Sequence, residues 1–96
     1  MNIVIQLEAQ VEIAEAYNYY ESVSNGLGAA FLLAVEACID GIQRSPEMYA
    51  VVYKEVRRGL LRRFPYGIFY IVEADQIIVL ACFHARRDPK QWQQRA

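Results

Sequence analysis

Hydrophobic positions near the start of the chain first recur at every second residue and then at helical spacing. The alternation from Asn2 to Leu7 predicts a short first strand. Beyond it, Ile13, Tyr17 and Tyr20 are spaced by four and three residues, which places them on one face of a helix. The Ser-Asn-Gly sequence at residues 24–26 breaks this pattern. The first quarter of the chain therefore predicts a strand followed by a helix.

The second helix has the clearest pattern in the chain. Its apolar side chains fall on a single helix face, and they are Phe31, Val35, Cys38, Ile39 and Ile42. Ser45-Pro46 ends the pattern because the residue before a proline avoids the helical region. Since only about four residues join the two helices, we expect them to form an antiparallel helix hairpin.

The remaining residues predict strands, although residues 48–53 are ambiguous. We expect strands at about Lys54–Arg58, Leu60–Phe64, Tyr66–Glu73 and Gln76–His84. The last two are apolar on both faces, which is typical of strands at the centre of a sheet. The tight Ala-Asp link between them predicts an antiparallel pair. The tail from Asp88 to Ala96 predicts one or two helical turns.

This order of elements predicts an α+β fold in a single domain over residues 1–96. We expect an N-terminal strand and an antiparallel helix hairpin packed on a mainly antiparallel sheet of about four strands. The helix hairpin covers one face of this sheet. Side chains on the other face must then meet water, the C-terminal tail or a partner.

Composition adds an apolar excess, since 55% of the 96 residues are hydrophobic. A domain of this size buries only about two-thirds of the surface that its unfolded chain exposes, so this excess predicts either a partner surface or a well-packed core. No apolar run reaches the length of a membrane-spanning helix, and the first residues lack the features of a secretion signal. We therefore expect a cytoplasmic protein. We then expect Cys38 and Cys82 to be reduced residues of the core, with a disulfide between them as the alternative.

Charge divides the chain into an acidic half and a basic half. Residues 1–50 carry one arginine and seven acidic side chains, whereas residues 51–96 carry nine basic and four acidic side chains. The net charge of −1 hides this polarity. The basic half should attract an anionic partner.

Two late segments, Arg62–Tyr70 and Val79–Trp92, resemble the RelE/ParE toxin superfamily, and its ParE-like branch in particular. The Tyr-Tyr-Glu sequence at 19–21, the glycines of 26–31 and Pro46 are similar to the same family, so the resemblance covers nearly the whole chain. It implies a plasmid-stabilisation type toxin that inhibits growth. It also implies a cognate antitoxin that neutralises the toxin and forms a hetero-oligomer with it.

The resemblance implies two possible targets, DNA gyrase for ParE-type members and ribosome-bound messenger RNA for RelE-type members. Cutting RNA without a metal needs a general base, a general acid and cations near the phosphate. The resemblance implies that a RelE-type toxin uses a Tyr or His near its C-terminus for this acid–base chemistry. In this sequence no Tyr or His follows His84. We therefore favour gyrase binding, with no catalytic residue, metal or cofactor. A ribosome-dependent endoribonuclease and an inactive remnant remain the alternatives.

The candidate residues for binding a partner or target are the basic and tail positions. They are Arg57, Arg58, Arg62, Arg63, His84, Arg86, Arg87 and Trp92. Each also has a structural interpretation: strand-edge charge for the first four, and a half-buried histidine bonded to the backbone for His84. Arg86 or Arg87 is a candidate to pair with an acidic side chain of the helix hairpin. Trp92 is expected to fold back on the sheet as an anchor.

Overall fold

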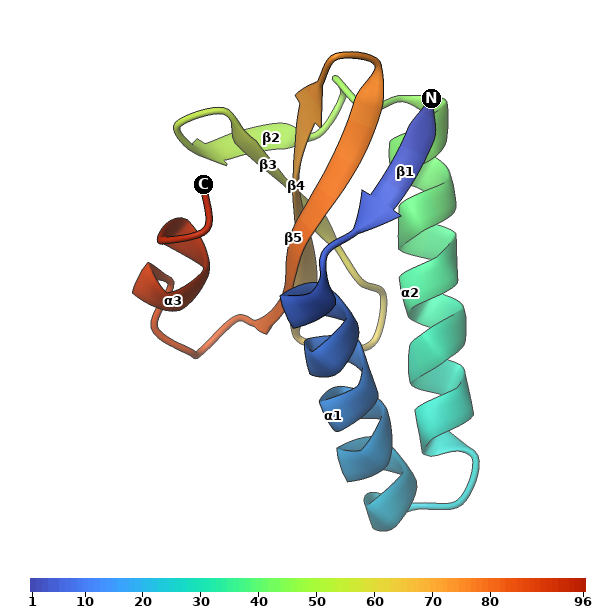
Figure 1. Ribbon diagram of the computed structural model, residues 1–96. Coiled ribbons are helices and arrows are strands. Elements are labelled where there is room, and N and C mark those ends of the chain that lie inside the picture. Colours follow the sequence, from blue (N-terminus) through green and yellow to red (C-terminus); the bar gives the residue numbers. More distant parts are fainter.

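The computed structural model describes residues 1–96, with the two long helices on one side of a five-stranded sheet and a short third helix on the other (Figure 1). The elements are β1 (Asn2–Ile5), α1 (Leu7–Val23), α2 (Leu27–Arg44), β2 (Ala50–Tyr53), β3 (Val56–Leu60), β4 (Tyr66–Glu73), β5 (Gln76–His84) and α3 (Lys90–Gln93). The α+β fold and the helix hairpin are confirmed. No helix has both the length and the apolar character needed to cross a membrane.

The strands lie in the order β1-β5-β4-β3-β2. The predicted β4–β5 hairpin is confirmed, and its two-residue turn has positive φ values of 47° at Ala74 and 63° at Asp75, as a tight hairpin turn requires. The sheet has five strands rather than about four, and it is mixed. Its one parallel pair joins β1 to β5, with Ile5 opposite Val79.

The predicted strand at Leu60–Phe64 is wrong, because pairing between β3 and β4 ends with Leu60 opposite Gly67. Residues 61–65 form a loop that is closed by a hydrogen bond from the Leu61 N–H to the Tyr66 carbonyl oxygen. Leu61 and Phe64 are buried in the core, so their apolar character reflects packing by a loop. The ambiguous residues 48–53 contain β2, and Leu7, expected in the first strand, begins α1.

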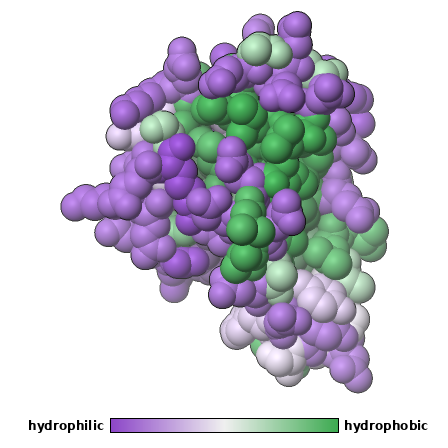
Figure 2. All heavy atoms as spheres, in the orientation of Figure 1, coloured by the Kyte–Doolittle hydropathy of each residue, from purple (hydrophilic) through white to green (hydrophobic).

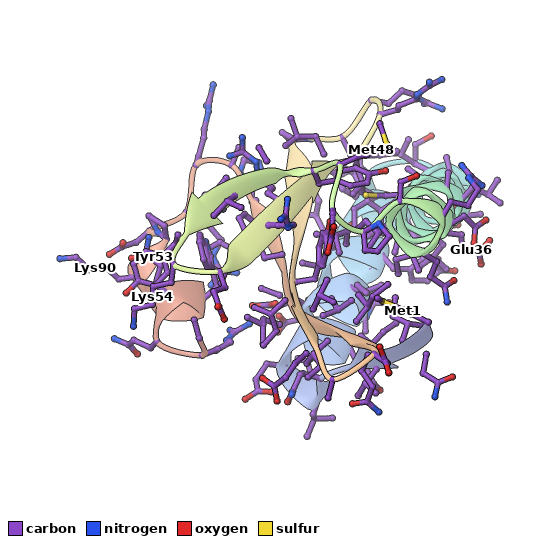
Figure 3. All side chains as sticks on the ribbon, turned by 90° about the horizontal axis from the view of Figure 1, so that it is seen from above. Met1, Glu36, Met48, Tyr53, Lys54 and Lys90 are labelled. Atoms are coloured by element: carbon purple, nitrogen blue, oxygen red, sulfur yellow. The ribbon has the colours of Figure 1, made fainter.

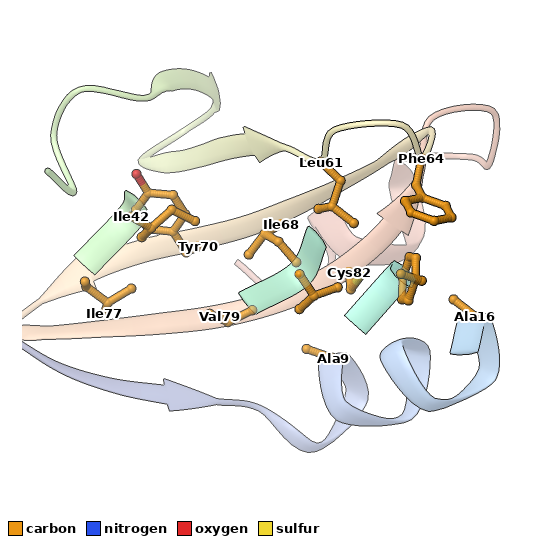
Figure 4. Packing of buried hydrophobic residues seen from close by; sticks show 12 residues of the cluster. Ala9, Ala16, Ile42, Leu61, Phe64, Ile68, Tyr70, Ile77, Val79 and Cys82 are labelled. Atoms are coloured by element: carbon orange, nitrogen blue, oxygen red, sulfur yellow. The ribbon is translucent and has the colours of Figure 1, made fainter. Parts of the chain in front are cut away.

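The main core lies between the helix hairpin and the sheet (Figure 4). Ala9 and Ala16 turn from α1 toward the sheet, while Phe31 from α2 is fully buried. The Phe31 ring meets Phe64 and Tyr66 edge-on, with centroids 5.3 and 5.2 Å apart. This aromatic contact fixes the loop of residues 61–65 against the helices.

A second core lies on the opposite face of the sheet, beneath α3. Trp92 is only 4% exposed and stacks on Phe69, with ring centroids 4.3 Å apart. Tyr53 meets the same indole edge-on at 5.8 Å. Seen from above, Tyr53 and Lys54 lie beside Lys90, whereas Glu36 lies on the far side with α2 (Figure 3). The expected anchoring of Trp92 on the sheet is confirmed.

The tail covers only part of this second face. Apolar side chains remain visible where β5 and β1 cross the view (Figure 2). Val4 faces the same way as its neighbour Ile78 on β5 and is 41% exposed. Leu7 and Val11, which follow on α1, are also exposed. The apolar excess of the sequence therefore appears partly as surface near the edge strand.

Both cysteines are free; Cys82 is buried in the main core, whereas Cys38 is half-buried and packs against it. Burial raises the pKa of Cys38 from 9.0 to about 11, and burial together with the nearby Glu12 carboxylate raises the pKa of Cys82 to about 12. The native thiols therefore stay protonated to a higher pH than the thiols of the unfolded chain.

These shifts predict a loss of stability in alkali. Between pH 9 and about pH 12 the unfolded chain binds fewer protons than the native protein, so the free energy of unfolding falls as the pH rises. The urea midpoint, measured from neutral pH to about pH 11, should decrease through this window. The Cys82→Ala variant should show a flatter profile. An unchanged midpoint in the native protein would contradict the assignment.

Candidate functional site

Four of the candidate arginines lie at one end of the sheet, in two loops that touch. The Ala85 N–H donates a 2.8 Å hydrogen bond to the Pro65 carbonyl oxygen, which joins loop 61–65 to the loop after β5. Arg62 and Arg63 lie in the first loop, and Arg86 and Arg87 lie in the second; all four are exposed. None of them has a carboxylate within 4 Å, because the chain's single ion pair lies elsewhere. This end of the molecule therefore carries four arginines without a direct ion pair, and Asp88 is the only acidic residue of the two loops.

A groove of about 320 Å³ opens beside these loops, between the sheet and α3. Four of the eight candidate residues line it, namely Arg58, His84, Arg87 and Trp92. Phe69 and Phe83 contribute its apolar floor, and no acidic side chain takes part in the lining. Its composition suits a ligand with negative charge and some apolar surface.

Arg58 reaches the groove because Gly67 lies beside it on β4. A Cβ atom at Gly67 would approach Arg58 Cγ to 3.0 Å and Cδ to 3.2 Å. The absence of a side chain at Gly67 thus lets the Arg58 stem lie flat across the sheet. Phe69 is paired with Arg58 in the β3–β4 register and shares this face.

Arg87 is held by two contacts, neither of which is made with a carboxylate. Its guanidinium carbon lies 4.5 Å from the centre of the Phe83 ring, and Nη2 donates a 2.7 Å hydrogen bond to Gln91 Oε1. A cation over an aromatic face keeps its full charge. The expectation that Arg86 or Arg87 pairs with an acidic residue of the helix hairpin is wrong, because neither has a carboxylate within 4 Å. Arg87 nevertheless borders a second hollow, which Glu8, Glu12 and Glu15 of α1 also line.

His84 is half-buried at the end of β5 and bonded to the backbone, as its structural interpretation proposed. Its Nδ1 accepts a 3.0 Å hydrogen bond from the Arg86 N–H, and its ring meets Tyr66 edge-on at 5.1 Å. This bond requires an unprotonated Nδ1, so the proton of the neutral ring is on Nε2. Burial raises the pKa of Tyr66, which keeps this phenol neutral.

Arg57 is separated from the groove because it points to the opposite face from Arg58. Its Nη1 donates hydrogen bonds to the carbonyl oxygens of Glu47 (2.9 Å) and Tyr49 (2.8 Å). Close by, the Tyr70 hydroxyl donates a 2.6 Å bond to the Pro46 carbonyl oxygen, and burial raises the Tyr70 pKa to about 12. These bonds fix the segment between α2 and β2, which is a structural role for Arg57.

The groove depends on a contact that the sequence did not indicate, between the tail and α1. Arg95 Nη2 donates a 2.9 Å bond to Glu12 Oε2, and Nη1 donates to Glu12 Oε1 (3.1 Å) and to the Leu80 carbonyl oxygen (2.9 Å). Glu12 Oε1 also accepts the Cys82 N–H at 3.0 Å. The bond to Glu12 raises the pKa of Arg95.

This contact has a clear origin in the sheet. Pairing of β1 with β5 ends at Val79, and a register shift leaves Leu80 without a partner on β4. Backbone groups of β5 beyond this point would lack partners, and buried polar groups without partners are costly. The Glu12 carboxylate and the Arg95 guanidinium supply them. One feature of the sequence could have indicated this contact: Glu12 shares the buried face of α1 with Ala9 and Ala16, where an acidic residue needs a partner.

Comparison with known proteins identifies the family and supports the fold. Residues 3–89 match the family model described as ParE toxin of type II toxin-antitoxin system, parDE. Toxin ParE2 from two strains of Mycobacterium tuberculosis is 28% identical over 79 residues, covering 81% of this chain and 75% of that protein. A solved structure, the chromosomal ParDE TA system from P. aeruginosa, matches with a TM-score of 0.68 and 16% sequence identity. The match covers 90% of this chain and 97% of the chain in that structure.

The fold and the sequence match define a toxin of a type II toxin–antitoxin system. The chain belongs to the ParE toxin family, within the RelE/ParE superfamily that its sequence resembles.

Proposed function

We propose that this chain inhibits growth by binding and poisoning DNA gyrase, and that a cognate antitoxin neutralises it. The observation that carries the proposal is the ParE family match over residues 3–89. The matched structure, described as a ParDE toxin–antitoxin system, supports a protein antitoxin as the partner. The four arginines without a direct ion pair at one end of the sheet support an anionic target surface, such as gyrase with its DNA.

The arrangement around His84 favours binding over RNA cleavage. Its Nδ1 is occupied by a backbone N–H, and the tail from Asp88 to Ala96 contains no second histidine or tyrosine to act with it. General acid–base cleavage of RNA needs two such groups on either side of the scissile phosphate. The ribonuclease alternative is favoured by the presence of Arg58, Arg87 and His84 in one groove and by the Tyr66 ring, which lies 5.1 Å from the His84 ring.

Expression of the chain alone in bacteria should arrest growth, induce the SOS response and leave protein synthesis running. One culture with an inducible promoter, an SOS reporter and pulse labelling of new protein measures all three. The Arg62→Gln/Arg63→Gln/Arg86→Gln triple variant should lose most of the SOS signal, since electrostatic attraction by clustered cations speeds association by about 10-fold or more. The matched control is Arg44→Gln, which removes one exposed arginine on the helix side.

The outcomes separate the alternatives. Arrest with an immediate loss of protein synthesis and without an SOS signal would contradict gyrase binding and establish the ribonuclease reading. Growth without arrest would contradict toxicity and leave an inactive remnant. Purified gyrase, supercoiled DNA and the protein provide a direct check, because a gyrase poison accumulates cleaved DNA in the assay.

A further inference from the structure

The groove beneath α3 holds two arginines whose side chains are positioned before any partner arrives. Arg58 is laid across Gly67, and Arg87 is held between the Phe83 ring and Gln91. Arginine side chains lose considerable rotamer freedom on binding, so prior positioning lowers the cost of binding an anion. No acidic residue lines the groove, although on its other side Arg87 borders a hollow that Glu8, Glu12 and Glu15 line.

The rest of the groove is apolar and small. Leu60, which is 64% exposed, forms part of its wall, and Phe69 and Phe83 form its floor. Its volume of about 320 Å³ lies at the lower end of the range for small-molecule pockets, about 300–1,000 Å³. A ligand of matching character has one anionic group flanked by one or two apolar side chains.

The aromatic rings argue against a nucleic acid in this place. Single-stranded nucleic acids bind proteins by stacking bases on exposed aromatic faces. Here Phe69 and Trp92 stack on each other at 4.3 Å, and the guanidinium of Arg87 covers Phe83. All three rings are at most 7% exposed, so they offer no free face for a base. Two arginines beside aromatic rings that already pack against other side chains fit a peptide carboxylate better than a nucleotide.

We propose that this groove is a receptor for an Asp or Glu side chain within an apolar peptide segment, and that the antitoxin supplies this segment. The inference rests on the proposed function for the identity of the partner. Arg58 and Arg87 bind the carboxylate by charge-assisted hydrogen bonds, while a flanking apolar side chain covers Leu60, the exposed apolar wall of the groove. Binding here places the antitoxin beside the exposed arginines of the two loops and so shields the charged end of the toxin.

Trp92 makes the proposal directly measurable. It is the chain's single tryptophan and it lines the groove, so its fluorescence reports on occupancy in the full-length protein. The probes are acetyl-Leu-Glu-Leu-amide and its neutral counterpart acetyl-Leu-Gln-Leu-amide, neither of which absorbs in the tryptophan region. We expect the glutamate peptide to bind about tenfold more tightly, because charge-assisted hydrogen bonds are roughly twice as strong as neutral ones.

The variants localise the binding. Arg58→Gln and Arg87→Gln should each weaken binding of the glutamate peptide about tenfold and leave the glutamine peptide unaffected. Arg44→Gln makes the same chemical change on the helix side of the sheet and should leave both affinities unchanged. Circular dichroism of each variant establishes that the fold is retained.

Several results would overturn the proposal. They are equal affinity for the two peptides, an equal loss of affinity in the Arg44→Gln variant, no binding of either peptide, or tighter binding of a short oligothymidylate than of the glutamate peptide. Failure here is separable from failure of the proposed function. Peptide binding is measured on the isolated protein, whereas gyrase poisoning is measured by the SOS response and DNA cleavage.

Discussion

Replacing Glu12 with alanine is expected to lower the free energy of unfolding by about 3–5 kcal/mol. Glu12 is only 9% exposed and forms an ion pair with Arg95 while accepting the Cys82 N–H. Its removal leaves a partly buried guanidinium and a buried N–H without their partner. A domain has only about 5–15 kcal/mol in total, so urea unfolding should show a large drop in the midpoint.

A double variant separates the charge from the hydrogen bonds. Glu12→Gln/Arg95→Gln keeps polar groups able to bond with each other and with β5, so we expect it to be more stable than Glu12→Ala. Each single glutamine variant should be less stable than the double variant, because each leaves one charge uncompensated. A loss below about 1 kcal/mol in Glu12→Ala would show that water replaces the carboxylate without cost.

Replacing Trp92 with alanine is expected to cost about 3–5 kcal/mol, as for other large buried aromatic residues. The indole is almost completely buried, stacked on Phe69 and in edge contact with Tyr53. Its loss removes most of the apolar contact between α3 and the sheet, so the tail should become accessible to protease.

Thermal unfolding followed by circular dichroism measures the change, and limited proteolysis measures the release of the tail. The control is Trp92→Phe, which keeps an aromatic ring over Phe69 and should cost less than half as much. Intact protection of the tail in Trp92→Ala would contradict the anchoring role.

The elements that the sequence predicted well are those in which the spacing of apolar residues matches the residues that are buried. α2 presents one apolar stripe to the sheet, and β4 and β5 are apolar on both faces because helices cover one side and Trp92 covers part of the other. Both strands begin and end at the predicted residues, Tyr66–Glu73 and Gln76–His84. Tertiary packing and local pattern agree in these segments.

The elements that the sequence did not predict depend on contacts between distant residues. The loop of 61–65 looks like a strand because Leu61 and Phe64 are buried, although no partner strand lies beside them. β2 is short and lies at the sheet edge, where one face is exposed and the pattern is weak. The parallel pairing of β1 with β5 leaves no signal in either segment.

The sequence names four residues that the structure brings together in one groove, but it does not indicate their geometry, and their role in binding stays a prediction. Alternation along a strand correctly separates Arg57 from Arg58, but it cannot say which of them faces a groove. That assignment requires the position of α3, which depends on Trp92 and on the pairing of Arg95 with Glu12. The arginines of loop 61–65 were assigned to a strand, so their place beside the loop after β5 was not expected.

The parallel pairing of β1 with β5 gives this toxin a particular order of assembly on the ribosome. The helix hairpin contains only local contacts, so it is able to form while later residues are still being added. β1 gains its partner only when residues 76–79 have left the exit tunnel, and Glu12 gains Arg95 later still. The nascent chain therefore has no groove until residues 92–95, which hold α3 against the sheet, have left the exit tunnel.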